Sequence, residues 1–154
     1  MHSIEAPAEV LAALDAQDAA DAAIRGLNLD VLSPAVRLRV LERMEASRRR
    51  QIAVSHDVIA GLAKEDSADI GGPVHKVVAD WLRISYAEAS RRLRDATELS
   101  PRLTLTGQEL PPPLPATAAA WREGLLDGQH LRVIQTFIRD LPDAVPAATV
   151  DSAE

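Results

Sequence analysis

WLRISYAEASRRLRDA, residues 81–96, joins the end of one helical pattern to the start of another. Within it, Ser85 begins the Ser-x-x-Glu pattern, in which the serine and Glu88 each satisfy an exposed amide of a new helix. The short turn before Ser85 and the apolar periodicity on both sides predict a helix-turn-helix-like hairpin over 74–99. Such a hairpin reads DNA when its second helix presents side chains to base edges and phosphates. The alternative is an ordinary helical hairpin in a bundle, with a solvated arginine face.

The second helix of the hairpin carries the residues that we expect to contact DNA. Advancing 100° per residue from the buried Ala89 places Arg91 and Arg94 on the opposite, outward side. Arg92 lies nearer the buried edge, where it is expected to cross apolar surface or pair with an acid. Arg83 occupies the turn position where glycine is usual, so it takes a left-handed backbone or the turn has another shape. Assisting DNA contacts are expected from Arg83, Ser85, Ser90 and Arg92.

The rest of the chain also has a helical composition. Hydrophobic residues make up 47% of the chain and aromatic residues only 3%, which favours close-packed helices over a sheet. A loop is predicted over 66–73, a connector with a short extended piece over 100–115, and a left-handed break at Gly128. The sequence therefore predicts an all-α, multi-helix fold with one long helix, the hairpin described above and a second C-terminal hairpin. The further helices expected cover about 7–24, 34–64, 116–127 and 129–141.

Charge divides the chain into three predicted segments. Residues 1–30 hold six acidic residues and one arginine, and form an acidic helix and linker. Residues 31–141 form the all-α domain, and 142–154 form an acidic tail that we expect to be the start of a downstream region. The net charge of -6 argues against a protein that coats nucleic acid indiscriminately, although local basic patches allow an anionic partner.

A second basic patch is expected on the long helix. Its side chains are expected to grip phosphates with a salt-dependent affinity. The alternative is a solvated face that pairs with the acidic first helix. The patch consists of Arg39, Arg43, Arg48, Arg49 and Arg50.

Several classes of function are not expected. The chain has no cysteine, which excludes disulfides and thiolate metal sites, and no apolar run is long enough to cross a bilayer. The N-terminus does not resemble a signal peptide, so we expect a cytoplasmic protein, associated with the nucleoid if it binds DNA. The pairs His56–Asp57 and His75–Asp80 lack a nucleophile and a shared inward face. We therefore expect no enzyme activity, catalytic residue, metal, cofactor or small-molecule substrate.

Three stretches together point to a family. They are Leu32-Ser33-Pro34, HKVVADWLRISYAEASRRLRDATEL at 75–99, and LTLTGQELPPPLPATAAAWREGLLDGQHLRVIQTFIRDLPD at 103–143. In these stretches the chain resembles the actinobacterial 13E12-repeat family, whose N-terminal region is domain of unknown function 222. The resemblance covers roughly residues 30–154 and is most specific at 105–107 and 114–117.

The resemblance implies a domain associated with nucleic acid. Many members of the family continue into an HNH endonuclease module, which gathers histidines and an asparagine around a metal ion. This chain has four histidines, widely separated, and Asn28 is its only asparagine, so we expect no nuclease site in it. The prediction is a targeting or regulatory domain that binds double-stranded DNA.

A protein–protein interaction or dimerisation module without DNA affinity is the rival prediction. The long helix and the stripe from Val133 to Leu141 offer more apolar surface than a small bundle buries. A homodimer is compatible with DNA binding, because a dimer places two reading helices on adjacent half-sites.

Overall fold

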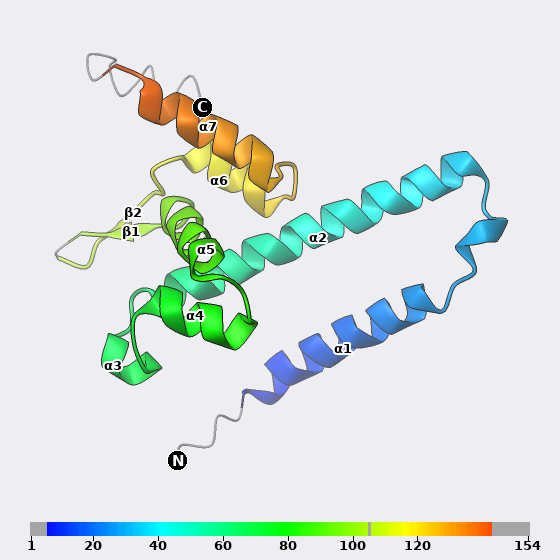
Figure 1. Ribbon diagram of the computed structural model, residues 1–154, viewed down its shortest axis with the longest axis horizontal. Helices are drawn as coiled ribbons and strands as arrows, with labels where there is room; N and C mark the ends of the chain where they lie inside the picture. Colours follow the sequence, from blue (N-terminus) through cyan, green and yellow to red (C-terminus); the bar gives the residue numbers. More distant parts are fainter. Residues whose placement is uncertain (1–5, 105, 143–154) are drawn as a thin grey trace. The chain divides into compact units, whose positions relative to one another are not determined.

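The structure is a computed structural model that describes residues 6–104 and 106–142. Most of the described chain is helical, and its only sheet is one small two-stranded ribbon, which confirms the predicted all-α class (Figure 1). The chain divides into two compact units, the N-terminal unit Met1–Leu41 and the C-terminal unit Glu42–Glu154. Within the described ranges, no helix has both the length and the apolar character needed to cross a membrane.

In its described residues, from residue 6 onward, the N-terminal unit is made of helices without buried side chains. It contains α1 (Ala8–Arg25), the 3-10 helix η1 (Leu29–Val31) and the beginning of α2 (Pro34–Leu62). The Ser33 hydroxyl accepts the N–H of Val36 at 3.4 Å, which confirms the predicted start of the long helix. No residue of α1 or η1 is buried. The unit therefore has little core of its own.

The first core of the C-terminal unit joins the end of α2 to the predicted hairpin. The hairpin consists of α4 (Val74–Leu82) and α5 (Tyr86–Glu98), as the sequence pattern predicts. Four of the six core residues are alanines, which lets the three helices approach closely. The buried residues are Ile59, Ala60, Val78, Ala79, Ala89 and Ala96.

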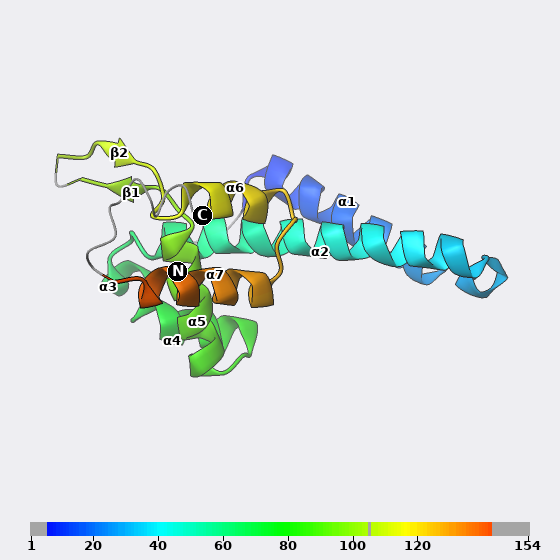
Figure 2. The ribbon, with the colours of Figure 1, turned by 90° about the horizontal axis from the view of Figure 1, so that it is seen from above.

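A second core lies where α6 and α7 pack on the middle of α2. Figure 2 shows α6 (Pro115–Arg122) and α7 (Gly128–Asp140) as an antiparallel pair beside α2. Trp121 is the largest residue of this core. Its buried members are Ala53, Leu99, Ala118, Trp121 and Leu131. The predicted stripe on α7 is only partly covered, since Val133 and Phe137 remain exposed.

Two connectors differ from the predictions. The expected loop 66–73 contains a short helix, α3 (Ser67–Ile70), because the Asp66 carboxylate caps it by accepting the N–H of Ala68 at 3.0 Å. In the connector 100–115, the expected extended piece contributes to one strand of the two-stranded ribbon. There β1 (Arg102–Leu103) pairs antiparallel with β2 (Glu109–Leu110).

The break in the C-terminal hairpin falls at Gly124 and not at Gly128. Gly128 begins α7, which Asp127 caps, whereas Gly124 has the left-handed backbone, with φ 74°. A Cβ on Gly124 would lie 2.9 Å from the carbonyl oxygen of Ala46 in α2. Glycine is therefore needed where this link passes the long helix. Of the predicted acidic tail 142–154, residues 143–154 lie outside the described part of the chain.

Candidate nucleic-acid interface

The turn of the hairpin is closed by Arg83 and capped by Ser85. Arg83 has φ 54° and ψ 44°, so of the two geometries considered from the sequence it takes the left-handed one. The N–H of Ile84 donates back to the carbonyl of Ala79 at 3.0 Å, which ends α4 in the manner of a glycine cap. The Ser85 hydroxyl accepts the N–H of Glu88 at 3.1 Å, which confirms the predicted cap of α5.

The Glu88 side chain is held by arginines of its own helix. Its carboxylate accepts Arg91 Nη2 at 2.7 Å and Arg92 Nε at 2.8 Å, so the reciprocal half of the predicted capping box is replaced by ion pairs. The hydrogen bond from Arg91, with a further one from Arg92, lowers the pKa of Glu88 to about 2 against the opposing effect of burial. The expectation that Arg92 pairs with an acid is met by this contact.

Arg94 and Ser90 lie on the outward face of α5, whereas Arg91 is only partly exposed there. The Arg94 side chain is 62% exposed, whereas that of Arg91 is 33% exposed and its Nη1 lies 2.9 Å from the buried carboxylate of Asp95. The predicted outward arginine pair is therefore half right. Arg91 is turned away because two carboxylates, one turn before and one turn after it, bind its guanidinium.

A hollow between α5 and α7 brings further arginines near Arg94. It has a volume of about 700 Å³, and Arg132 and Arg139 of α7 line it together with Arg94. On the same lining, Gln135 Nε2 donates to Glu98 at 2.7 Å and to Asp95 at 3.1 Å. Arg132 and Arg139 were not among the predicted contacts. Their spacing of seven residues, two turns on one helix face, was a readable signal.

The five residues of the second basic patch all lie on α2. Arg39 belongs to the N-terminal unit, and the other four residues belong to the C-terminal unit. Arg48 Nη2 and Arg49 Nε bind Glu45 at 2.8 and 2.9 Å, and these two hydrogen bonds, that from Arg48 first, lower the pKa of Glu45 to about 2. Arg43 and Arg50 are exposed.

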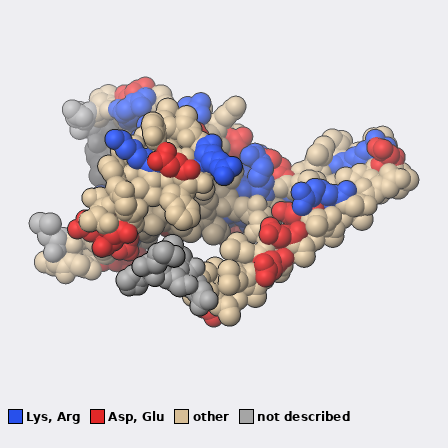
Figure 3. Space-filling view, turned by 60° about the horizontal axis from the view of Figure 1, so that its bottom comes forward, with Lys and Arg blue, Asp and Glu red and all other residues tan. Residues whose placement is uncertain are grey.

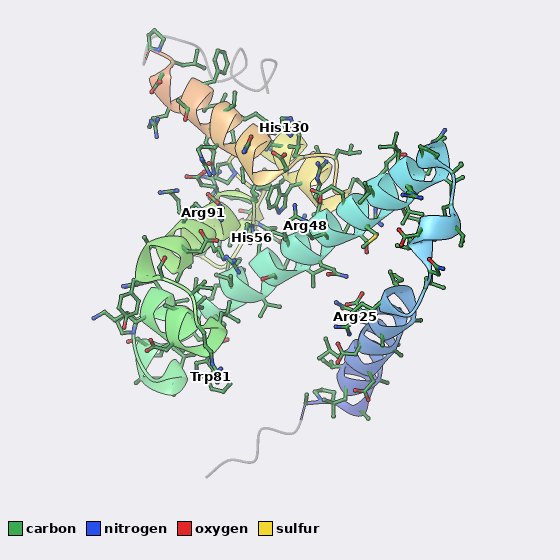
Figure 4. All side chains as sticks on the ribbon, turned by 45° about the vertical axis from the view of Figure 1, so that its right-hand side comes forward. Arg25, Arg48, His56, Trp81, Arg91 and His130 are labelled. Atoms are coloured by element: carbon green, nitrogen blue, oxygen red, sulfur yellow. The ribbon has the colours of Figure 1, made fainter. Side chains whose placement is uncertain are left out.

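Arg48 and Arg49 lie on a pocket that also contains residues of α5. Arg91 and Arg92 line this pocket with them. Two arginines from each of the two predicted basic regions therefore lie on the same pocket. Figure 4 shows Arg48, His56 and Arg91 gathered where α2 and α5 face each other.

The aspartates of the pairs His56–Asp57 and His75–Asp80 contact other residues. Asp57 binds Arg122 at 3.3 Å, while the neighbouring His56 stacks on Trp121. Asp80 accepts the Tyr86 hydroxyl at 3.5 Å. The described ranges hold no group of three or more histidine, aspartate and glutamate side chains placed to bind a metal ion.

The charges of the C-terminal unit are mixed and not segregated. On the face in view in Figure 3, basic and acidic side chains are interspersed. Over the described residues 42–142, the 14 Lys and Arg are balanced by 14 Asp and Glu, as counted from the sequence. Contact with a polyanion would therefore rest on a few arginines and not on the field of the whole unit.

Comparison with known proteins identifies relatives of this chain. The model of the family described as Domain of unknown function (DUF222) matches residues 38–154. An uncharacterized protein of Mycobacterium tuberculosis is 43% identical over 147 residues, which cover 95% of this chain and 32% of that protein. An uncharacterized protein of Mycobacterium bovis is 41% identical over 149 residues, again 95% of this chain and 32% of the relative. The chain thus spans about a third of the length of these curated relatives. No solved structure matches it.

Proposed function

We propose that this chain, which belongs to the DUF222 family of domains of unknown function, binds double-stranded DNA through its α4–α5 hairpin. In this proposal it is a targeting or regulatory domain without nuclease chemistry of its own. The observation that carries the proposal is the three-helix core of α2, α4 and α5, which leaves one face of α5 uncovered behind a three-residue turn. This is the arrangement by which helix-turn-helix proteins brace a reading helix.

Arg94 and Ser90 are the proposed contacts on the open face of α5. Both are exposed, and the partner of Arg94, Asp95, lies 3.9 Å away and leaves the guanidinium largely available. Arg83 in the turn and Arg132 on α7 supply the proposed phosphate contacts. Arg91 is not a proposed DNA contact, because Glu88 and Asp95 bind its guanidinium.

The test is fluorescence anisotropy of a labelled random duplex at about 50 and 200 mM salt. The two proposed phosphate contacts, Arg83 and Arg132, predict that affinity falls roughly 12-fold over this range. The double variant Arg83→Glu, Arg94→Glu should lose binding. The control double variant Arg102→Glu, Arg122→Glu makes the same change of charge on β1 and α6 and should reduce binding much less.

Failure of the wild-type chain to bind at tens of micromolar, with its helical circular dichroism intact, would refute the proposal. So would equal loss in the double variant Arg83→Glu, Arg94→Glu and in the control double variant Arg102→Glu, Arg122→Glu. Equal loss would indicate a general charge effect and not a reading helix.

A second candidate function, protein association, is favoured by the apolar surface of the N-terminal unit. Six large apolar side chains of α1, η1 and the link between them are exposed. Surface of this kind marks an interaction site more often than scattered single residues do. The six residues are Val10, Leu11, Leu14, Ile24, Leu27 and Val31.

Sedimentation velocity over a concentration series tests the second candidate. Leu14→Glu should weaken association, while Ala16→Glu, on the opposite side of α1, should leave it unchanged. Sedimentation as a monomer at every concentration would remove self-association as the role of this surface.

A further inference from the structure

A pocket of about 290 Å³ opens among α2, α5, α6 and the start of α7. All of its lining residues belong to the C-terminal unit. Four arginines line it with the carboxylates of Glu88 and Asp127, while Glu45 and Asp95, outside the lining, bind Arg48, Arg49 and Arg91. Its arginines are Arg48, Arg49, Arg91 and Arg92.

Two of these arginines use little of their hydrogen-bonding capacity within the protein. Arg92 donates through Nε to Glu88 at 2.8 Å, and Arg49 donates through Nε to Glu45 at 2.9 Å. Among the described residues, their terminal nitrogens have no hydrogen-bond acceptor. An arginine has five N–H donors in a planar fork, so each side chain keeps a terminal edge that fits an oxyanion. Both side chains are half-buried, which limits competition from water.

The inner wall of the pocket contains a buried histidine without a hydrogen-bond partner. His56 is 4% exposed, and its Nδ1 has no partner among the described residues. Burial lowers the pKa of His56, more than Asp95 raises it, so the ring is neutral at pH 7 and can donate one hydrogen bond. The ring is fixed by stacking on Trp121, with centroids 5.2 Å apart and planes inclined by 20°. A buried polar nitrogen without a partner is rare in folded proteins and calls for an explanation.

We propose that this pocket binds a small phosphate-bearing anion, either inorganic phosphate or the phosphate group of a small monoester. Arg49 and Arg92 would donate their terminal N–H groups, and His56 would add a hydrogen bond from the inner wall. Phosphate fits better than a carboxylate because it accepts from several directions at once, as donors from α2 and α5 require. Its charge at pH 7, about -1.5 to -2 for a monoester, favours charge-assisted hydrogen bonds from the arginine N–H groups that the carboxylates do not use.

The size of the pocket limits the ligand. Its volume of about 290 Å³ lies just below the range for sites of drug-sized molecules, roughly 300 to 1,000 Å³. It therefore admits phosphate or a small phosphomonoester. This inference does not rest on DNA binding, since its residues are not the proposed DNA contacts Arg83, Ser90, Arg94 and Arg132.

Tryptophan fluorescence provides a direct test. Trp81 is 77% exposed, so Trp81→Phe leaves Trp121, on the pocket wall, as the reporter. In this background, inorganic phosphate and glycerol 3-phosphate are titrated against sodium chloride at matched ionic strength. We expect a saturable change with one site per chain, confirmed by calorimetry. Tighter binding of one probe identifies the free anion or the monoester as the preferred form.

Variants locate the binding site. Arg92→Gln should weaken binding by about tenfold or more, because it removes a charged donor. Arg139→Gln, on an exposed part of α7, should bind like the parent. Ser55→Glu places a carboxylate on the pocket lining, so it should abolish binding without lowering the melting temperature. Arg94→Glu should keep phosphate binding even if DNA binding is lost.

Two results would overturn the proposal. One is the absence of binding by either probe at millimolar concentration while circular dichroism shows the chain folded. The other is parental affinity in both Arg92→Gln and Ser55→Glu, which would place the anion elsewhere.

Discussion

Arg83 illustrates a conflict between local backbone preference and side-chain use. At φ 54° it is the one non-glycine residue with a left-handed backbone in the described ranges. This conformation costs about 1–2 kcal/mol for an L-residue. Arg83→Gly should therefore stabilise the chain by up to about 1 kcal/mol, after the entropy cost of glycine is subtracted. Urea unfolding measures this gain.

Substitutions of Arg83 can distinguish an effect on folding stability from an effect on DNA affinity. Arg83→Ala removes the guanidinium but keeps the backbone strain, so it should lose DNA affinity without the gain in stability that glycine brings. If Arg83→Gly binds DNA as well as the parent, the arginine is not a contact and its retention has another reason.

Gly124 is required by a close approach between segments far apart in sequence. An alanine there would combine a left-handed backbone, at φ 74°, with a Cβ only 2.9 Å from the Ala46 carbonyl oxygen. We expect Gly124→Ala to destabilise the chain by about 2–4 kcal/mol. Gly107→Ala is the matched control, because Gly107 has φ 82° but its added Cβ meets nothing within 4 Å. A lower melting temperature for Gly124→Ala than for Gly107→Ala would be due to the close contact between the added Cβ and Ala46. Equal melting temperatures would contradict this explanation.

Single residues were predictable where their partners are close in sequence. The Ser33 and Ser85 caps depend on amides three residues ahead, and both were predicted. The pairing of Arg91 with Glu88 and Asp95 also follows from their i,i+3 and i,i+4 spacing, whereas the positions of apolar residues around the helix do not reveal it. The role of Gly124 was not readable, since it depends on the approach of α2.

At the scale of elements, the ion pairs of α5 make the stability of the helix depend on pH. Arg91, then Arg92, holds the pKa of Glu88 at about 2, below its ordinary value of 4.5. The carboxylate therefore contributes stability that is fully present above about pH 4.5 and is lost as the pH falls towards 2.

Glu88→Gln should flatten the acid limb of the stability curve. Unfolding free energies from urea titrations between pH 6 and pH 2.5 would fall less steeply in the variant than in the parent. Glu123→Gln, which changes an exposed carboxylate on another element, is the control. Parallel curves for Glu88→Gln and the parent would show that this network does not contribute to folding.

The helices predicted best are those with both a periodic apolar face and a local start signal. Helix α4 begins at residue 74, where the predicted hairpin begins, and α2 ends two residues before its predicted end at 64. Helix α3 was missed because a one-turn helix has no periodicity to detect and its Gly71-Gly72-Pro73 end is typical of a loop. The end of α6 was placed too late because the apolar pattern continues through Leu125 and Leu126 after the backbone has left the helix.

At the scale of the whole molecule, the buried core of the described residues is confined to the C-terminal unit. The apolar residues of both clusters fall between Ala53 and Leu131. The boundary predicted after residue 30 separates the acidic helix from the hairpins, whereas the compact N-terminal unit extends to Leu41 because the first turns of α2 belong to it. Composition could identify α1 as a separate acidic segment. It could not show where α2 passes from one unit to the other, since that depends on which of its turns receive packing partners.

Removal of residues 1–41 should therefore leave the melting temperature nearly unchanged. No residue of α1 or η1 is buried, so their loss removes little apolar contact from the folded state. Thermal unfolding of the shortened chain is compared with that of the full chain, and sedimentation shows whether self-association goes with the removed unit. A fall of more than about 5 °C, equivalent to about 1 kcal/mol, would mean that the N-terminal unit stabilises the rest. An unchanged melting temperature together with lost association would assign folding to the C-terminal unit and assembly to the apolar surface of α1 and η1.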